Sequence, residues 1–162
     1  MSILSVEKDV EGLSFVLVAE FDAPIARVWQ LWADSRKLER WWGPPGYPAT
    51  VGNHDLRPGC AVTYFMTGPG GETSRGWWRV TSVEPPRSLG FTDGFADEDG
   101  TPSSELPTHA VQVRLSEQEA GTRMELRSVF ESREQMEQME DLGAFERIPQ
   151  SVAQMDDVLA HT

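Results

Sequence analysis

The chain has 162 residues, one cysteine, a hydrophobic fraction of 39% and a formal net charge of −12 at pH 7. Such an acidic chain disfavours partners that carry many phosphates, both nucleic acids and anionic membrane surfaces, because they require lysine and arginine. One cysteine excludes an intrachain disulfide, and the sequence has neither a signal-peptide layout nor an apolar run long enough to cross a bilayer. We therefore expect one cytoplasmic domain over residues 1–162, with no nucleic-acid or membrane partner.

The first clear element is a strand over residues 13–21, where apolar side chains recur at every second position. Residues 1–11 are too weakly patterned to predict an element. A short helix should follow the strand, with Pro24 in its first turn and Asp22 as a possible cap. Its apolar face is formed by residues at helical spacing: Ile25, Val28, Trp29 and Trp32.

A second short helix is predicted directly after the first. Asp34 can cap it, and it carries Leu38 and the pair Trp41-Trp42 before Gly43-Pro44 ends it. Trp29 and Trp32 are expected in the core, whereas Trp41 is expected to face Trp78 across a cavity.

Alternating apolar residues and turn signals then predict a series of strands. These strands cover residues 47–53, 61–67, 75–84, 88–92, 111–116 and 123–130. The polar segment from Asp93 to Pro107 is predicted to be the one long loop.

The last third of the chain changes to helical spacing at Ser132, a predicted N-cap. This helix should break near Gly143, and an amphipathic helix should restart close to Glu146 and run to the C-terminus. Pro149 is the obstacle, because proline fits only the first turn of a helix or a kink. The predicted class is α+β, with an antiparallel sheet and helices on one face.

Several motifs along nearly the whole chain resemble one known family. They are Phe21-Asp22-Ala23-Pro24, Trp41-Trp42-Gly43-Pro44, Arg57-Pro58-Gly59, Gly76-Trp77-Trp78 and Asp93-Gly94-Phe95-Ala96-Asp97. On these motifs the chain resembles the activator-of-heat-shock-protein-ATPase homologue family, within the START-like, birch-allergen-like superfamily also called SRPBCC or polyketide-cyclase-like. The resemblance implies a helix-grip fold, in which a curved antiparallel sheet wraps around a long C-terminal helix, with two short helices near the N-terminus.

The chain departs from that family's pattern at two places. Cys60 stands where a second glycine usually follows Arg-Pro-Gly, and Glu146-Arg147 stands where Glu-Gly is usual. Both departures bear on the path of the last helix and on the shape of any cavity beneath it.

A cavity between the sheet and the last helix is the main candidate site. Ligand sites are mostly apolar with a few placed polar groups. The candidates for its lining are Trp41, Tyr64, Met66, Trp78, Phe91, Phe130, Met139 and Met155. The same side chains could instead simply fill the core. The candidates for polar groups in the cavity are His54, Arg79, His109 and Glu105.

Catalytic and metal motifs are weak. Neither His54 nor His109 has a carboxylate, serine or cysteine at a diagnostic spacing. Asp93, Asp97 and Asp99 before Gly100 resemble a calcium-binding loop. When Gly100 is placed at position 6 of such a loop, however, position 1 is Phe95 instead of an acidic or amide side chain. The histidines and Cys60 also lack zinc spacing. We therefore predict no catalytic residue, no metal and no cofactor.

These observations leave three hypotheses for the function. The first is a protein that binds a small apolar molecule in the cavity, without catalysis. The second is an enzyme of cyclase or hydrolase type, which uses a polar group in that cavity. The third is an interaction module associated with a chaperone, which the family name suggests. A homodimer is plausible because tryptophan-rich and apolar strand faces often pair.

Overall fold

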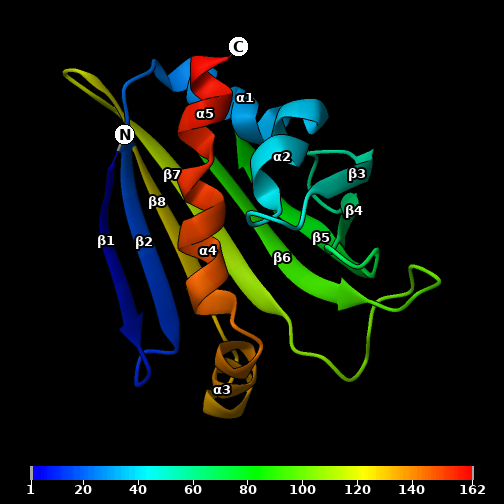
Figure 1. Ribbon diagram of the computed structural model, residues 1–162. Helices are drawn as coiled ribbons and strands as arrows, with labels where there is room; N and C mark the ends of the chain where they lie inside the picture. Colours follow the sequence, from blue (N-terminus) through cyan, green and yellow to red (C-terminus); the bar gives the residue numbers. More distant parts are fainter. Residues whose placement is uncertain (1, 162) are drawn as a thin grey trace.

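One antiparallel sheet and five helices account for the regular structure over residues 2–161, the part of the chain that the computed structural model describes (Figure 1). The strands are β1 (Ser2–Asp9), β2 (Ser14–Phe21), β3 (Ala49–His54), β4 (Ala61–Thr67), β5 (Thr73–Glu84), β6 (Ser88–Ala96), β7 (His109–Gln118) and β8 (Gly121–Val129). The helices are α1 (Ile25–Ala33), α2 (Ser35–Trp42), α3 (Arg133–Asp141), α4 (Ala144–Ala153) and α5 (Met155–Ala160).

The eight strands form a single curved sheet in the order β1-β2-β8-β7-β6-β5-β4-β3. Figure 1 shows α4 and α5 end to end across its concave face, with α1 and α2 beside α5. Val152, Met155 and Val158 on these helices are buried in one core with strand residues such as Leu17 and Val113. The α+β, helix-grip prediction is confirmed.

The two predicted side-chain caps of α2 and α3 are confirmed. The Asp34 carboxylate accepts hydrogen bonds from the backbone amides of Arg36 and Lys37. The Ser132 hydroxyl accepts one from the amide of Gln135. The cap predicted for α1 was wrong, because Pro24 occupies its N-cap position without a side-chain hydrogen bond. The tight link from β2 brings α1 straight onto the end of the sheet.

The strands differ from the predictions in two places. Residues 2–9 form β1, an edge strand that pairs with β2. The sequence of this edge strand has no clear apolar alternation that marks a buried face, and its apolar residues Leu4 and Val6 are exposed. Strand β6 continues to Ala96, so the irregular segment before β7 is shorter than the loop predicted from Asp93. A polar residue, Asp93, therefore lies inside a strand.

The break before the last helix was predicted correctly, but the position of Pro149 was not. Gly143 has a φ of 80°, in the left-handed region that glycine adopts without strain, and α4 starts directly after it. Pro149 consequently lies inside α4 instead of in its first turn. The early start of α4 also places Arg147 within its second turn, on the side of the sheet.

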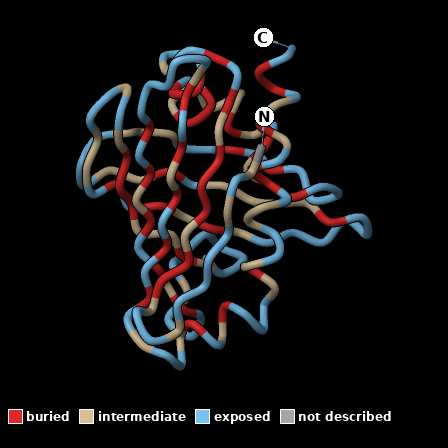
Figure 2. The backbone as a smooth tube through the Cα atoms, turned by 90° about the vertical axis from the view of Figure 1, so that its left-hand side faces the viewer, coloured by how far each residue is buried: buried red, intermediate tan, exposed pale blue. Residues whose placement is uncertain are grey.

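The core is built largely from aromatic rings. Trp32, Trp41 and Trp78 are at most 1% exposed. Trp32 meets Trp41 edge to face at a centroid distance of 4.6 Å, and Trp78 stacks on Phe91 at 4.0 Å. Figure 2 shows the buried segments along the strands and neighbouring helices, and the exposed ones at the turns. None of the helices in the described part of the chain has the length and hydropathy to span a lipid bilayer.

Candidate ligand pocket

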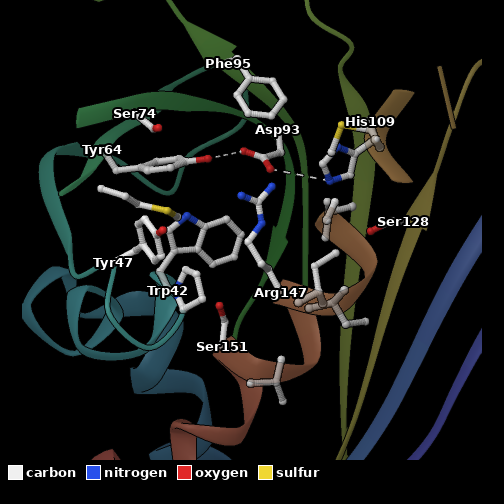
Figure 3. Close-up of a pocket in the computed structure, with 18 of the residues that line it drawn as sticks. Trp42, Tyr47, Tyr64, Ser74, Asp93, Phe95, His109, Ser128, Arg147 and Ser151 are labelled. Carbon is white, nitrogen blue, oxygen red and sulfur yellow. Dashed lines mark hydrogen bonds and ion pairs between the residues drawn. The ribbon is translucent and has the colours of Figure 1, made fainter. Parts of the chain in front are cut away.

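A cavity of about 200 Å³ lies between the concave face of the sheet, the end of α2 and the inner face of α4. Much of its wall is apolar, and a smaller part is polar. Apolar residues that contribute to the wall include Trp42, Met66, Phe95, Val111, Met139 and Ile148. The polar part includes Tyr64, Asp93, His109, Arg147 and Ser151 (Figure 3).

Four of the eight predicted lining residues are at the pocket, namely Trp41, Tyr64, Met66 and Met139. The other four, Trp78, Phe91, Phe130 and Met155, are not among its lining residues and are at most 3% exposed. They fill the core around the pocket: Trp78 on β5 and Phe91 on β6 stack on each other, and Met155 and Phe130 are buried in hydrophobic clusters. The structure therefore corrects that half of the set from pocket wall to core.

The tryptophan pair has roles different from those expected. Trp41 lies at the pocket, but its indole Nε1 donates to the backbone oxygen of Leu31 at 2.9 Å. Trp42 packs edge to face against Trp78, with centroids 4.9 Å apart. Trp42, which is less buried, thus takes the position facing Trp78 that had been predicted for Trp41.

The polar candidates separate in the same way. His109 lines the pocket, whereas His54, Arg79 and Glu105 do not. The His54 ring makes a hydrogen bond to the backbone oxygen of Trp32 at 3.1 Å. Arg79 and Glu105 are exposed to solvent. Strand alternation explains Arg79, because Trp78 before it points into the core.

Three side chains from β4, β6 and β7 form a polar cluster in the pocket wall (Figure 3). Tyr64 Oη donates a hydrogen bond to Asp93 Oδ1 at 2.8 Å. His109 Nε2 lies 3.6 Å from Asp93 Oδ2. The exposed fractions of the Asp93 and His109 side chains are only 16% and 7%. The cluster is thus a set of ionisable groups that is largely shielded from bulk water.

Gly76 makes this cluster possible. It lies on β5, opposite Tyr64 on β4, and a Cβ at this position would clash with the tyrosine ring. Without a side chain at residue 76, the ring of Tyr64 can cross β5 and reach Asp93 on β6. A requirement for close approach, not for a positive φ, therefore selects glycine here.

Burial shifts the protonation of the cluster. It raises the pKa of Asp93 from 3.8 to about 7, although the hydrogen bond from Tyr64 opposes the shift. Burial lowers the pKa of His109 from 6.5 to about 4. Burial and, secondarily, the charge of Asp93 raise the pKa of Tyr64 well above its usual value. At neutral pH the histidine is therefore neutral, and Asp93 exchanges its proton most readily.

Three buried polar atoms at the pocket have no hydrogen-bond partner among residues 2–161. They are His109 Nδ1, Ser128 Oγ and the indole Nε1 of Trp42. Burying such atoms unpaired costs roughly 1–3 kcal/mol each, which a ligand or water can recover. No group of three or more potential metal ligands occurs in the described part of the chain.

A glutamine connects the two walls of the pocket. Gln154, between α4 and α5, donates from its side-chain Nε2 to the backbone oxygens of Trp41 at 3.2 Å and Gly43 at 2.7 Å. These bonds join the end of α2 to the junction of the C-terminal helices. The two segments joined in this way are more than a hundred residues apart in sequence.

Sequence reasoning missed Asp93 and Arg147 as pocket residues. The signal for Asp93 was available: it lies two residues from both Phe91 and Phe95, so strand alternation puts all three on one face. Arg147 was noticed only as a departure from the family pattern. Its orientation depends on where α4 begins, and Gly143 and the packing of α4 on the sheet determine this.

Residues 22–160 match the model of the family described as Activator of Hsp90 ATPase homolog 1-like protein. The chain belongs to this family. The resemblance inferred from the tryptophan and Arg-Pro-Gly motifs is thus confirmed. No curated protein matched this Activator of Hsp90 ATPase homolog 1-like chain.

Solved structures resemble this family member over nearly its whole length. A protein from Arthrobacter aurescens is 49% identical, with a TM-score of 0.95, and the match covers 99% of this chain and 94% of that one. Protein Ms6760 from Mycobacterium smegmatis is 44% identical, with a TM-score of 0.90 and 99% coverage of both chains. The AHSA1 protein from Silicibacter pomeroyi is 25% identical, with a TM-score of 0.70, covering 91% of this chain and 97% of that one.

Proposed function

We propose that this protein binds a small, largely apolar ligand in the pocket between the sheet and α4. The observation that carries the proposal is the cavity of about 200 Å³ with a wall of aromatic, aliphatic and methionine side chains. Apolar cavities of roughly 150 Å³ can hold one benzene ring. A compound of one or two rings, or a short acyl chain, therefore suits this volume.

The unpaired polar atoms and the polar cluster support a ligand that is not purely hydrocarbon. Ligand sites typically combine apolar walls with a few polar groups that fix orientation. Here Asp93, His109 and Arg147 supply such groups around one pocket. A ligand with an apolar body and one polar end uses both parts of the wall.

Thermal unfolding with a panel of acyl-chain and polycyclic aromatic compounds tests the proposal. A ligand that binds only the folded state raises the Tm in a concentration-dependent way. Binding beside Trp41 and Trp42 should also quench tryptophan fluorescence. If no compound of the panel changes either signal, the proposed function is wrong.

A matched pair of variants on α4 links binding to this pocket. Ser151 lines the cavity and is 7% exposed, whereas the neighbouring Gln150 is exposed on the outer side of the same helix. Ser151→Leu should fill part of the cavity and weaken binding at least tenfold, a loss of about 1.4 kcal/mol. Gln150→Leu should leave the affinity unchanged. Equal affinities for the two variants would place the ligand elsewhere.

A second candidate, an enzyme of cyclase or hydrolase type, is favoured by the cluster of Tyr64, Asp93 and His109 inside the pocket. A carboxyl group with a pKa of about 7 can both donate and accept a proton near neutral pH. Mass spectrometry of a bound compound after prolonged incubation distinguishes the candidates. Conversion by the native protein but not by Asp93→Asn supports an enzyme, and an unchanged compound supports a binding protein.

A further inference from the structure

Arg147 is a cation at the pocket that has no ion-pair partner among residues 2–161. It lies in the second turn of α4 and is one of the residues lining the cavity. Figure 3 shows its guanidinium extending from the helix into the pocket, on the side of Trp42 and Asp93. The residue as a whole is exposed, so part of its side chain is accessible from solvent.

Nearby groups do not neutralise this charge. Among residues 2–161 no carboxylate lies within 4.0 Å of the Arg147 guanidinium. The other arginine at the pocket, Arg75, is placed differently, since its guanidinium carbon lies 5.1 Å from the centre of the Phe65 ring. The Arg147 guanidinium thus lies beside an apolar cavity without an ion pair to any carboxylate among residues 2–161.

Asp93 is an acidic residue that lines the same pocket, but its contacts make it a poor counterion for Arg147. One of its oxygens accepts from Tyr64, and the other faces His109. Burial also favours the neutral form of this carboxyl group, because its pKa is raised to about 7. The five N–H donors of Arg147 therefore remain available to a bound molecule.

We propose that Arg147 binds a carboxylate at the end of the pocket's ligand, so that the ligand class is a small apolar carboxylic acid. The inference rests on the proposed function and specifies it. A guanidinium forms two parallel hydrogen bonds with a carboxylate, which a neutral or cationic head group cannot match. The apolar wall then holds the body of the ligand while the arginine fixes its end.

Three probes of the same shape and different head-group charge provide the test. They are 2-naphthoate, 2-naphthamide and 2-naphthylmethylammonium, measured by isothermal titration calorimetry at about pH 6, where Asp93 is mostly protonated. We expect the carboxylate to bind at least tenfold more tightly than the amide, since charge-assisted hydrogen bonds are about twice as strong as neutral ones. The ammonium probe should bind most weakly. The preference should shrink in high salt, because the site is exposed.

Variants at one position and a matched control assign the preference to Arg147. Arg147→Gln has a similar helix propensity and should abolish the preference while keeping the affinity for the amide. Arg147→Lys should retain part of it. Arg133→Gln makes the same change of charge on an exposed site of α3, and its preference should equal that of the native protein.

The outcomes separate this inference from the proposed function. If all three probes bind alike, or if Arg147→Gln keeps the tenfold preference, the carboxylate inference is overturned and binding to the pocket still stands. If none of the probes binds at millimolar concentration, the inference is likewise overturned. The proposed function fails only if the wider apolar panel also produces no shift.

Discussion

The phenolic hydroxyl of Tyr64 donates a hydrogen bond to Asp93 Oδ1 over 2.8 Å and thereby connects β4 to β6 across the intervening strand. The bond lies within the ionisable cluster of the pocket wall. It also stabilises the ionised form of a carboxyl group that burial otherwise keeps protonated. The properties of the pocket therefore depend on this pair and on the glycine that lets the two side chains meet.

Removal of the phenolic hydroxyl should raise the pKa of Asp93 further. In Tyr64→Phe the carboxylate loses this donor while the ring remains, so the effect of burial is opposed only by the hydrogen bond from the backbone amide of Gly94. The measurement is a pH titration of the Asp93 side-chain carboxyl carbon by NMR. A pKa that stays at about 7 or falls would show that the hydrogen bond does not favour the ionised form.

Asp93 and His109 should change the free energy of unfolding in opposite directions as the pH rises. Between about pH 4 and 7 the native state keeps a proton on Asp93 that the unfolded chain has released, so this group lowers stability as pH rises. Between about pH 4 and 6.5 the unfolded chain holds a proton on His109 that the native state lacks, so this group raises stability as pH rises. In the native protein the two effects largely cancel.

Single substitutions should expose each effect. Asp93→Asn should make the free energy of unfolding rise with pH between 4 and 6.5, and His109→Gln should make it fall between 4 and 7. Each slope approaches at most about 1.4 kcal/mol per pH unit, the value for one proton. Urea unfolding at a series of pH values measures both, with Asp97→Asn, at an exposed site, as the control. Parallel slopes for the two variants would contradict the assignment.

Gly76→Ala should disturb the pocket although residue 76 lies in a regular strand. The added methyl group meets the ring of Tyr64, which must then move away from Asp93. Overpacking of this kind costs about 1–3 kcal/mol. Denaturant unfolding of Gly76→Ala and of the double variant Gly76→Ala/Tyr64→Ala is the check. If truncating Tyr64 does not relieve the cost of the alanine, the clash is not its cause.

The two tryptophans Trp29 and Trp41 should be alike in their effect on stability. Both are buried, at 6% and 1% exposure, and each truncation to alanine should cost about 3–5 kcal/mol. Trp41→Ala also removes the hydrogen bond to Leu31. This outcome differs from the expectation that Trp41 faces the cavity freely. A loss below about 1 kcal/mol for Trp41→Ala would restore that expectation.

The fold could be anticipated in detail because its signals are local. Apolar alternation predicted most strands, and Asp34 and Ser132 marked the starts of α2 and α3. The motif around Trp41 and Trp42 added the arrangement of sheet and helix. The edge strand β1 was missed because an edge with exposed Leu4 and Val6 has no clear buried period.

The pocket was only half anticipated, since its wall depends on contacts between distant segments. Tyr64 and Met139 were identified because they are large residues on elements expected to face each other. Trp78 and Phe91 have the same character, yet they stack on each other and fill the core. Periodicity identifies the inner face of a sheet, but only the packing of α4 decides which part of that face remains uncovered.

Gln154 has a consequence for the order of events during synthesis. Its side chain holds the end of α2 at Trp41 and Gly43, residues that precede it by 113 and 111 positions. A growing chain therefore carries the tryptophan helices α1 and α2 long before it has β8, α4 and α5, which complete the sheet and cover the cavity. The wall of the pocket is therefore complete only once α4, which supplies Arg147 and Ser151, has docked on the sheet.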